Sequence, residues 1–135
     1  MKALTVVPRQ PGSGAVREIP EPVATDEQAL VEVIRVGLCG TDAEIERGEY
    51  GAAPSGTDVL VLGHESLGRV ARPAKTGGPA AGTLVVASVR RPDGCPNCLA
   101  GEQDLCLWGG YTERGIGGIH GFCAERYAER PEYLF

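Results

Sequence analysis

Short stretches in which apolar and polar residues alternate recur along this chain of 135 residues. Alternation with a period of two places successive side chains on opposite faces, which predicts half-buried β-strands. In the clearest stretch, Ala29, Val31 and Val33 share one side. Residues 83–89 are apolar almost throughout and predict a buried strand. The expected strands cover residues 1–8, 15–19, 29–36, 67–72, 83–89 and 121–128.

A short helix is also expected. It covers Glu44–Arg47, and either Thr41 or Asp42 is placed to cap its first turn with a side-chain oxygen. Residues 49–58 and 71–82 are rich in glycine and proline, which predicts surface loops. Strands therefore dominate the chain, and the helix is a local insertion among them.

Residues 92–110 have no apolar periodicity but hold three of the five cysteines, which predicts an irregular lobe. The whole chain contains 20 glycines and 10 prolines, too many for a helix bundle. A length of 135 residues fits one domain. The fold class predicted from this order of elements is mainly β: a partly open β-barrel with a short helix and an extruded, cysteine-containing lobe.

Charge and hydropathy exclude several classes of protein. The formal net charge is −5 and the pI about 5.0, so we expect no nucleic-acid partner, which would require a basic patch. No apolar run approaches the length of about 18 residues that suggests a membrane span, so we expect no membrane partner. The N-terminus lacks the layout of a signal peptide, which favours a cytoplasmic protein. In that setting, close-spaced cysteines suggest metal ligation rather than disulfides.

Two stretches carry candidate chemistry. His64 and Glu65 follow Gly63, and a bend at that glycine would let both side chains reach one ion. Alone, this pair is also compatible with a core histidine beside a solvated glutamate. Cys39, between two nearby glycines, changes that interpretation. Thiolate, imidazole and carboxylate together form a ligand set suited to zinc with an open coordination position.

The two stretches also carry a family resemblance. Gly-x-Cys-Gly-Thr-Asp at 37–42 and Gly-His-Glu-x-x-Gly at 63–68 resemble the zinc-dependent medium-chain alcohol and polyol dehydrogenases, over essentially the whole chain. The resemblance implies the GroES-like catalytic domain of that family. It also implies a catalytic zinc, and oxidation of an alcohol with hydride transfer to NAD or NADP.

The resemblance assigns roles to single residues. Cys39 and His64 correspond to zinc ligands, and Glu65 to a ligand or to a partner that exchanges with water during turnover. Thr41 corresponds to the hydroxyl that receives the substrate proton. Asp42 corresponds to a carboxylate that holds the imidazole tautomer, and a helix N-cap is an equal alternative for it.

A second zinc site is implied in the lobe. The family pattern there is four cysteines spaced C-x2-C-x2-C-x7-C, and Cys95, Cys98 and Cys106 match the last three. The first position falls on Pro92, which has no ligating side chain, but the neighbouring Asp93 can supply an oxygen. A structural zinc held by the three cysteines and Asp93, and a lobe without metal, both stay open.

Flanking segments narrow the resemblance to glucose dehydrogenases of this superfamily. They are residues 89–92, 97–101 and 111–122. In that group, a glutamate matching Glu113 hydrogen-bonds sugar hydroxyls near the zinc; otherwise Glu113 is a solvated loop charge. A polar residue common near position 89 is replaced by Val89, so the sugar preference is expected to differ.

No Gly-x-Gly-x-x-Gly fingerprint occurs in a strand-to-helix context, so no residue here is expected to bind the dinucleotide. We therefore expect the cofactor-binding Rossmann domain outside this chain, the isolated chain to be inactive, and the complete enzyme to be a homo-oligomer. The leading hypothesis is an aldose 1-dehydrogenase. The alternatives are a zinc-dependent dehydrogenase of another polyol or an amino alcohol such as threonine, a zinc-binding interaction module, and a co-chaperonin.

Overall fold

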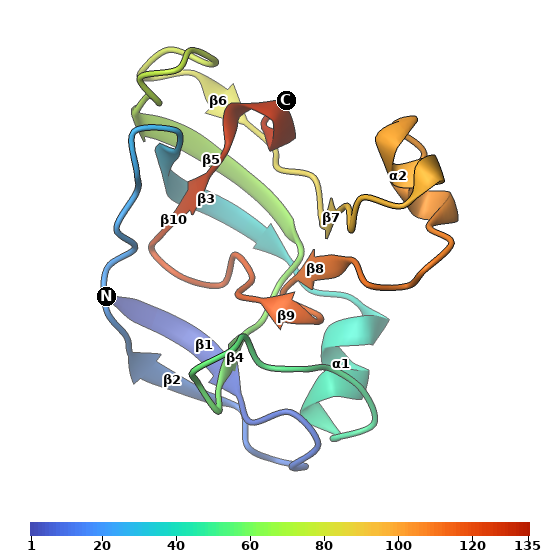
Figure 1. Cartoon of the computed structure of the whole chain (residues 1–135). Coiled ribbons are helices and arrows are strands. Elements are labelled where there is room, and N and C mark those ends of the chain that lie inside the picture. The colour runs from blue at the N-terminus through green and yellow to red at the C-terminus, as the bar shows by residue number, and fades with distance from the viewer.

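Three small β-sheets form the body of the computed structural model, which describes all residues 1–135 (Figure 1). The first sheet has the order β2 (Ala15–Glu18), β1 (Lys2–Val6), β4 (Leu60–Val61). The second has the order β10 (Arg126–Glu129), β3 (Ala29–Gly37), β5 (Glu65–Arg72), β6 (Leu84–Val85). The third has the order β7 (Arg90–Arg91), β8 (Thr112–Arg114), β9 (Gly118–Ile119), and only its β8–β9 pair is parallel.

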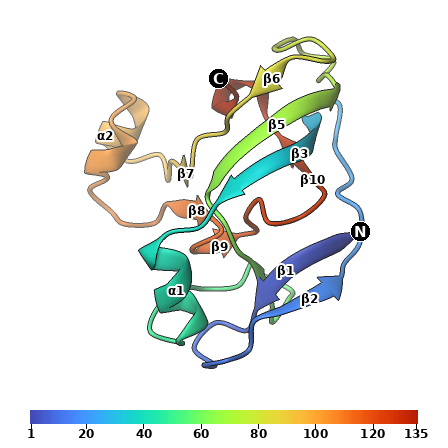
Figure 2. The same ribbon diagram turned by 180° about the vertical axis from the view of Figure 1, so that it is seen from behind.

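The sheets curl around one another without closing, which confirms the prediction of a mainly β, partly open barrel. Helix α1 (Gly40–Glu46) lies below the end of β3, and α2 (Pro96–Leu99) with the 3-10 turn η1 (Gln103–Leu105) forms the lobe. A last turn, η2 (Pro131–Tyr133), ends the chain. Seen from behind, the lobe projects to one side of the barrel, as its irregular sequence predicted (Figure 2). No helix has both the length and the apolar character that crossing a membrane requires.

Two apolar clusters hold the sheets together. The larger cluster packs against the second sheet, and its fully buried members include Val31, Val70 and Phe122. The smaller packs Ile45 of α1 onto Val6 and Leu60 of the first sheet and onto Leu62, the second residue after Leu60. Because burying an aliphatic side chain contributes about 1.5–3 kcal/mol, Ile45 fixes α1 against the barrel. The helix is thereby held at the end of β3, where Cys39 lies.

Two predicted strands are shorter than their apolar runs. Of residues 83–89, only Leu84 and Val85 pair with β5, and Leu84 and Val86 are about half-exposed. The prediction of a fully buried strand was wrong because this segment lies at the edge of its sheet. Of residues 121–128, only Arg126 onward joins β10. The preceding residues cross between sheets, where the amide of Leu4 donates to the carbonyl of Cys123 at 2.8 Å.

The helix begins earlier than its sequence suggested. Its N-cap is Cys39, in an extended conformation, rather than Thr41 or Asp42. Asp42 still satisfies a free donor at this end, because its Oδ2 accepts from the amide of Cys39 at 2.9 Å. This is the reciprocal half of a capping box, in which a carboxylate at the third helical position reaches back to the N-cap.

The C-terminal segment is partly docked. The chain ends on Tyr133, Leu134 and Phe135, an apolar sequence that predicts the edge of an exposed apolar face. Leu134 is instead buried in the larger cluster, since Phe135 exchanges two backbone hydrogen bonds with Val86. Phe135 itself is 72% exposed, so the expectation holds only for that ring.

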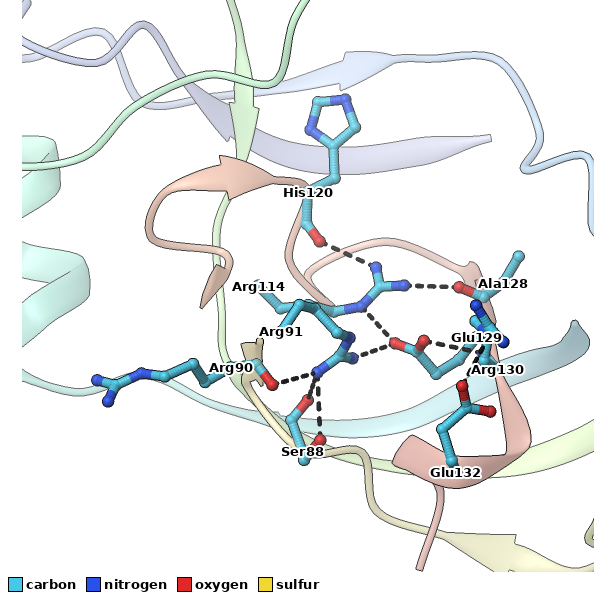
Figure 3. Close-up of polar contacts among 9 residues, drawn as sticks. All are labelled: Ser88, Arg90, Arg91, Arg114, His120, Ala128, Glu129, Arg130 and Glu132. Atoms are coloured by element: carbon cyan, nitrogen blue, oxygen red, sulfur yellow. Dashed lines mark hydrogen bonds and ion pairs between the residues drawn. The ribbon is translucent and has the colours of Figure 1, made fainter. Parts of the chain in front are cut away.

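A buried charge cluster ties the third sheet to β10 (Figure 3). The carboxylate of Glu129 accepts from Arg114 Nε at 2.8 Å and also pairs with Arg91. Arg114 donates further to the carbonyls of His120 and Ala128. Glu129 and Arg114 are almost fully buried. The cluster thereby fixes the base of β8, the strand that carries Glu113.

Candidate metal centres

Two groups of metal-ligating side chains come together in the folded chain. Cys39, His64 and Glu65 form the first group. Asp93, Cys95, Cys98 and Cys106 form the second. In each group one ligand atom per residue lies within 4.8 Å of all the others. Both groups have the membership that the sequence predicted, although their members lie up to 26 residues apart in the first group.

The first group forms where β3 ends and β5 begins. Cys39 Sγ lies 3.2 Å from His64 Nε2. A sulfur and a nitrogen on one tetrahedral zinc lie about 3.5 Å apart, so a small shift would admit the ion. Glu65 is exposed, and its side chain lies over Gly37, its cross-strand partner. A Cβ at Gly37 would lie 2.1 Å from a carboxylate oxygen of Glu65. The absence of a side chain at Gly37 therefore leaves room for that carboxylate.

Gly63 supplies the expected bend before His64. Its φ is +83°, which side chains with a Cβ rarely adopt, and a Cβ there would lie 2.6 Å from Cys123 Sγ and from Val36. The carbonyl of Gly63 accepts from the amide of Phe122 at 2.8 Å. The backbone that presents His64 is therefore fixed from both sides, and its imidazole is turned toward Cys39.

Asp42 braces both ligand segments. Its carboxylate is 4% exposed and accepts from the amide of Cys39 through Oδ2 and from the amide of Gly63 through Oδ1, at 2.9 and 3.0 Å. Its Oδ2 also lies 3.7 Å from Nδ1 of His64, a buried nitrogen without a hydrogen-bond partner. Asp42 is therefore not the N-cap residue that the sequence offered as an alternative, since Cys39 holds that position, but its carboxylate does face the imidazole.

We expect Asp42→Asn to lower zinc affinity about 10–100-fold, the usual cost of losing a carboxylate that orients a metal ligand. An amide has one acceptor oxygen, so its NH2 group would face one of the two backbone N–H donors. Competition with a fluorescent chelator measures the affinity. Asp26→Asn, which changes an exposed carboxylate paired with Lys75, is the matched control. Equal affinities for the two variants would contradict a bracing role for Asp42.

The remaining predicted site residues lie outside the first group. Thr41 is the second residue of α1, two positions after Cys39, and is half-buried. Glu113 lies on β8 and lines a cavity of about 300 Å³ with Tyr50, Tyr111 and Thr112. A larger apolar cavity of about 570 Å³, beside His120, contains none of the ligand residues. The candidate ligands therefore lie apart from the larger cavity.

The lobe group has the spacing of a metal site. Cys95 Sγ and Cys106 Sγ lie 3.8 Å apart, and two thiolates on one tetrahedral zinc lie about 3.8 Å apart. Asp93 Oδ2 lies 3.0 Å from Cys106 Sγ and accepts from the amide of Gly110 at 2.9 Å. Asp93 therefore lies within reach of the same point as the three cysteines.

Backbone donors around the lobe favour thiolates. The amides of Leu107 and Cys98 donate to Cys95 Sγ. Burial opposes the thiolate of Cys95, but these hydrogen bonds outweigh burial and lower its pKa. Hydrogen bonds from Cys106 and from the Cys95 amide hold the pKa of Asp93 well below its usual range. Burial raises the pKa of Cys98 to about 11, so binding a metal there would displace a proton.

Cys123 and Arg90 received no site role from the sequence. Cys123 packs against the smaller apolar cluster, and burial, followed by the charge of Asp42, raises its pKa to about 11, which makes it an inert structural thiol. Arg90 is the direct cross-strand partner of Glu113 and forms an ion pair with it at 2.8 Å. Pairing of β7 with β8 would have revealed that partnership, but strands of two and three residues leave no periodic signal in the sequence.

Comparison with known proteins agrees with this geometry. Residues 25–134 match the alcohol dehydrogenase GroES-like domain, so the chain belongs to that family. The resemblance seen in the sequence motifs and the expected GroES-like fold are thereby confirmed.

Individual relatives give a more specific comparison than the domain family does. The chain is 43% identical to a glucose 1-dehydrogenase of Methanocella arvoryzae and 45% identical to one of Thermoproteus tenax; each match covers 99% of this chain and 38% of the relative. The solved structure of Haloferax mediterranei glucose dehydrogenase in complex with NADP, Zn and gluconolactone superimposes with a TM-score of 0.89 at 39% identity, over 99% of this chain and 38% of that one. The chain thus spans about 38% of the length of these relatives.

Proposed function

We propose that this chain is the zinc-binding catalytic domain of an NAD(P)-dependent aldose 1-dehydrogenase, which oxidises the C1 hydroxyl of glucose or a related sugar to the lactone. The observation that carries the proposal is the convergence of Cys39, His64 and Glu65, braced by buried Asp42. The relatives named glucose 1-dehydrogenase, and the relative whose structure contains NADP, Zn and gluconolactone, support it.

The ligand set fits zinc: it offers one thiolate, one imidazole nitrogen and one carboxylate oxygen, and His64 has a carboxylate on the far side of its ring. When bound, zinc supplies Lewis-acid polarisation of the substrate hydroxyl. Cys39 and His64 would hold the ion, and exposed Glu65 would be free to bind it or to yield its position to solvent. The hydroxyl of Thr41 would accept the proton of the sugar hydroxyl while passing its own proton on toward solvent, and a bound nicotinamide would supply the hydride acceptor.

Glu113 is proposed to bind the sugar. Glu113 lines a cavity bordered by Tyr50 and Tyr111. A carboxylate accepts hydrogen bonds from vicinal hydroxyls, and aromatic rims suit the apolar faces of sugar rings. A substrate with a single hydroxyl would leave Glu113 unused, which favours an aldose or another polyol over a simple alcohol.

The lobe is proposed to hold a structural zinc through Asp93, Cys95, Cys98 and Cys106. The 3.8 Å sulfur separation and the oxygen of Asp93 support this set. We further propose that the Rossmann domain lies outside this chain, and that the complete enzyme is a cytoplasmic homo-oligomer.

Steady-state oxidation of glucose by the complete enzyme tests the function. We expect nicotinamide reduction with NAD or NADP, with gluconolactone as product. The matched comparison is Glu113→Gln, which should lower kcat/KM for glucose about 10–100-fold, since a hydrogen bond to a charged group contributes about 1.5–3 kcal/mol. The isolated 135-residue chain should show no turnover. Faster oxidation of an amino alcohol than of any aldose would overturn the proposal.

A further inference from the structure

Arg90 contacts Glu113 and the lobe at the same time. On the sheet side, its Nε and Nη2 both donate to Glu113 Oε1, at 3.1 and 2.8 Å. Arg90 and Glu113 are direct neighbours across β7 and β8, and their side chains are only 24% and 15% exposed. This is therefore a largely desolvated ion pair, unlike most surface pairs, which contribute little.

The same guanidinium group reaches the lobe through its third nitrogen. Nη1 lies 3.4 Å from the carbonyl oxygen of Gln103 and 3.3 Å from that of Asp104, and donates to both. These residues belong to η1, between the lobe cysteines Cys98 and Cys106. The face of Tyr111 covers the group, with Cζ 4.1 Å from the ring centroid. The guanidinium is thus held on three sides.

One carboxylate oxygen of Glu113 is left for an outside donor. Both N–H groups of Arg90 reach Oε1, and none reaches Oε2. Glu113 lines the cavity that also includes Tyr111, the ring stacked on Arg90. Because Nε and Nη2 both bind Oε1, Arg90 fixes the orientation of the Glu113 carboxylate and leaves Oε2 without a donor from the guanidinium.

From these contacts we infer that Arg90 is a positioning residue for sugar binding: it orients Glu113 through Oε1, leaves Oε2 to accept a sugar hydroxyl, and anchors that arrangement to the cysteine lobe. The inference rests on the proposed function, in which Glu113 binds the sugar. It adds a role for the lobe, whose turn η1 carries the carbonyls that hold the far side of the guanidinium. Lysine cannot replace Arg90, because an ammonium lacks the planar fork that spans Glu113 and η1.

A double-mutant cycle in the complete enzyme tests the inference. The variants are Arg90→Met, Glu113→Gln and the two combined, each loaded with zinc. Calorimetry without nicotinamide gives Kd for glucose, and steady-state kinetics give KM and kcat separately. We expect Arg90→Met to raise Kd and KM about 10–100-fold, the value of a charge-assisted hydrogen bond, with kcat changed much less. In the Glu113→Gln background, Arg90→Met should raise Kd by less than about threefold, because its target is already gone.

Controls separate positioning from folding. Arg126→Met removes an arginine paired with exposed Glu21 and should leave Kd unchanged. Arg90→Lys keeps the charge and should recover only part of the affinity, which keeps the test decisive if Arg90→Met fails to fold. Cobalt absorption of the lobe thiolates should be retained in Arg90→Lys, showing that the lobe remains assembled.

The outcomes are distinguishable. If Arg90→Met weakens glucose binding equally with Glu113 present and absent, Arg90 acts on folding rather than on Glu113, and the inference is wrong. If Glu113→Gln weakens glucose binding while both Arg90 variants bind normally, the inference is wrong but the proposed function stands. If glucose is not oxidised by the unaltered enzyme, the proposed function itself fails.

Discussion

Glu129→Ala is expected to lower the free energy of unfolding by about 3–5 kcal/mol, the usual cost of removing one partner from a buried ion pair. The carboxylate lies between Arg114 and Arg91, and Arg114 is 7% exposed (Figure 3). Burial already lowers the pKa of Arg114, which shows how poorly its charge is solvated. Without Glu129, two cations would face each other without a counter-charge.

Urea denaturation of the zinc-loaded chain, followed by far-ultraviolet circular dichroism, measures this effect. Glu132→Ala is the matched control, because Glu132 lies three residues away and pairs with Arg130 at the surface. It should be far less destabilising. If the two variants unfold at the same urea concentration, the Glu129 cluster is not the element that holds β8 to β10.

Cys39→Ser combined with His64→Ala should remove the metal from the first centre and lower kcat/KM of the complete enzyme by more than about 100-fold. Losing only an orienting partner costs about 10–100-fold, and here two direct ligands are lost. Glu65 alone cannot retain the ion, because it is exposed and offers one carboxylate.

Zinc content per chain, measured after dialysis, checks this prediction. Substituting Cys95, Cys98 and Cys106 by serine in every sample removes the lobe contribution. Cys123→Ser is the matched control, since this thiol is half-buried beside the site but belongs to neither ligand group. Zinc retained in the Cys39/His64 variant, or lost in the Cys123 variant, would contradict the assignment.

Much of the site could be predicted because its residues are chemically distinctive. Cys39, His64 and Glu65 have few roles in common other than metal binding, and Gly63 marks the bend they need. Asp93 could be named as a candidate ligand because it follows Pro92, the position at which the family pattern has a cysteine. In both groups the side chains meet as the sequence indicated.

What could not be predicted depends on contacts between distant segments. The run 83–89 looks like a buried strand, but only Leu84 and Val85 pair with β5, and Leu84 and Val86 remain about half-exposed. The start of α1 was misplaced because Asp42 caps the helix from its third position. Arg90 and Glu113 are 23 residues apart, and only the β7–β8 register brings them together.

Anomalous diffraction at the zinc edge, from crystals of the zinc-loaded chain, shows directly whether Cys39 and His64 bind the metal. We expect a peak between Cys39 and His64, about 2.3 Å from the sulfur and about 2.0–2.1 Å from Nε2. A peak confined to the lobe, with none between Cys39 and His64, would contradict this expectation.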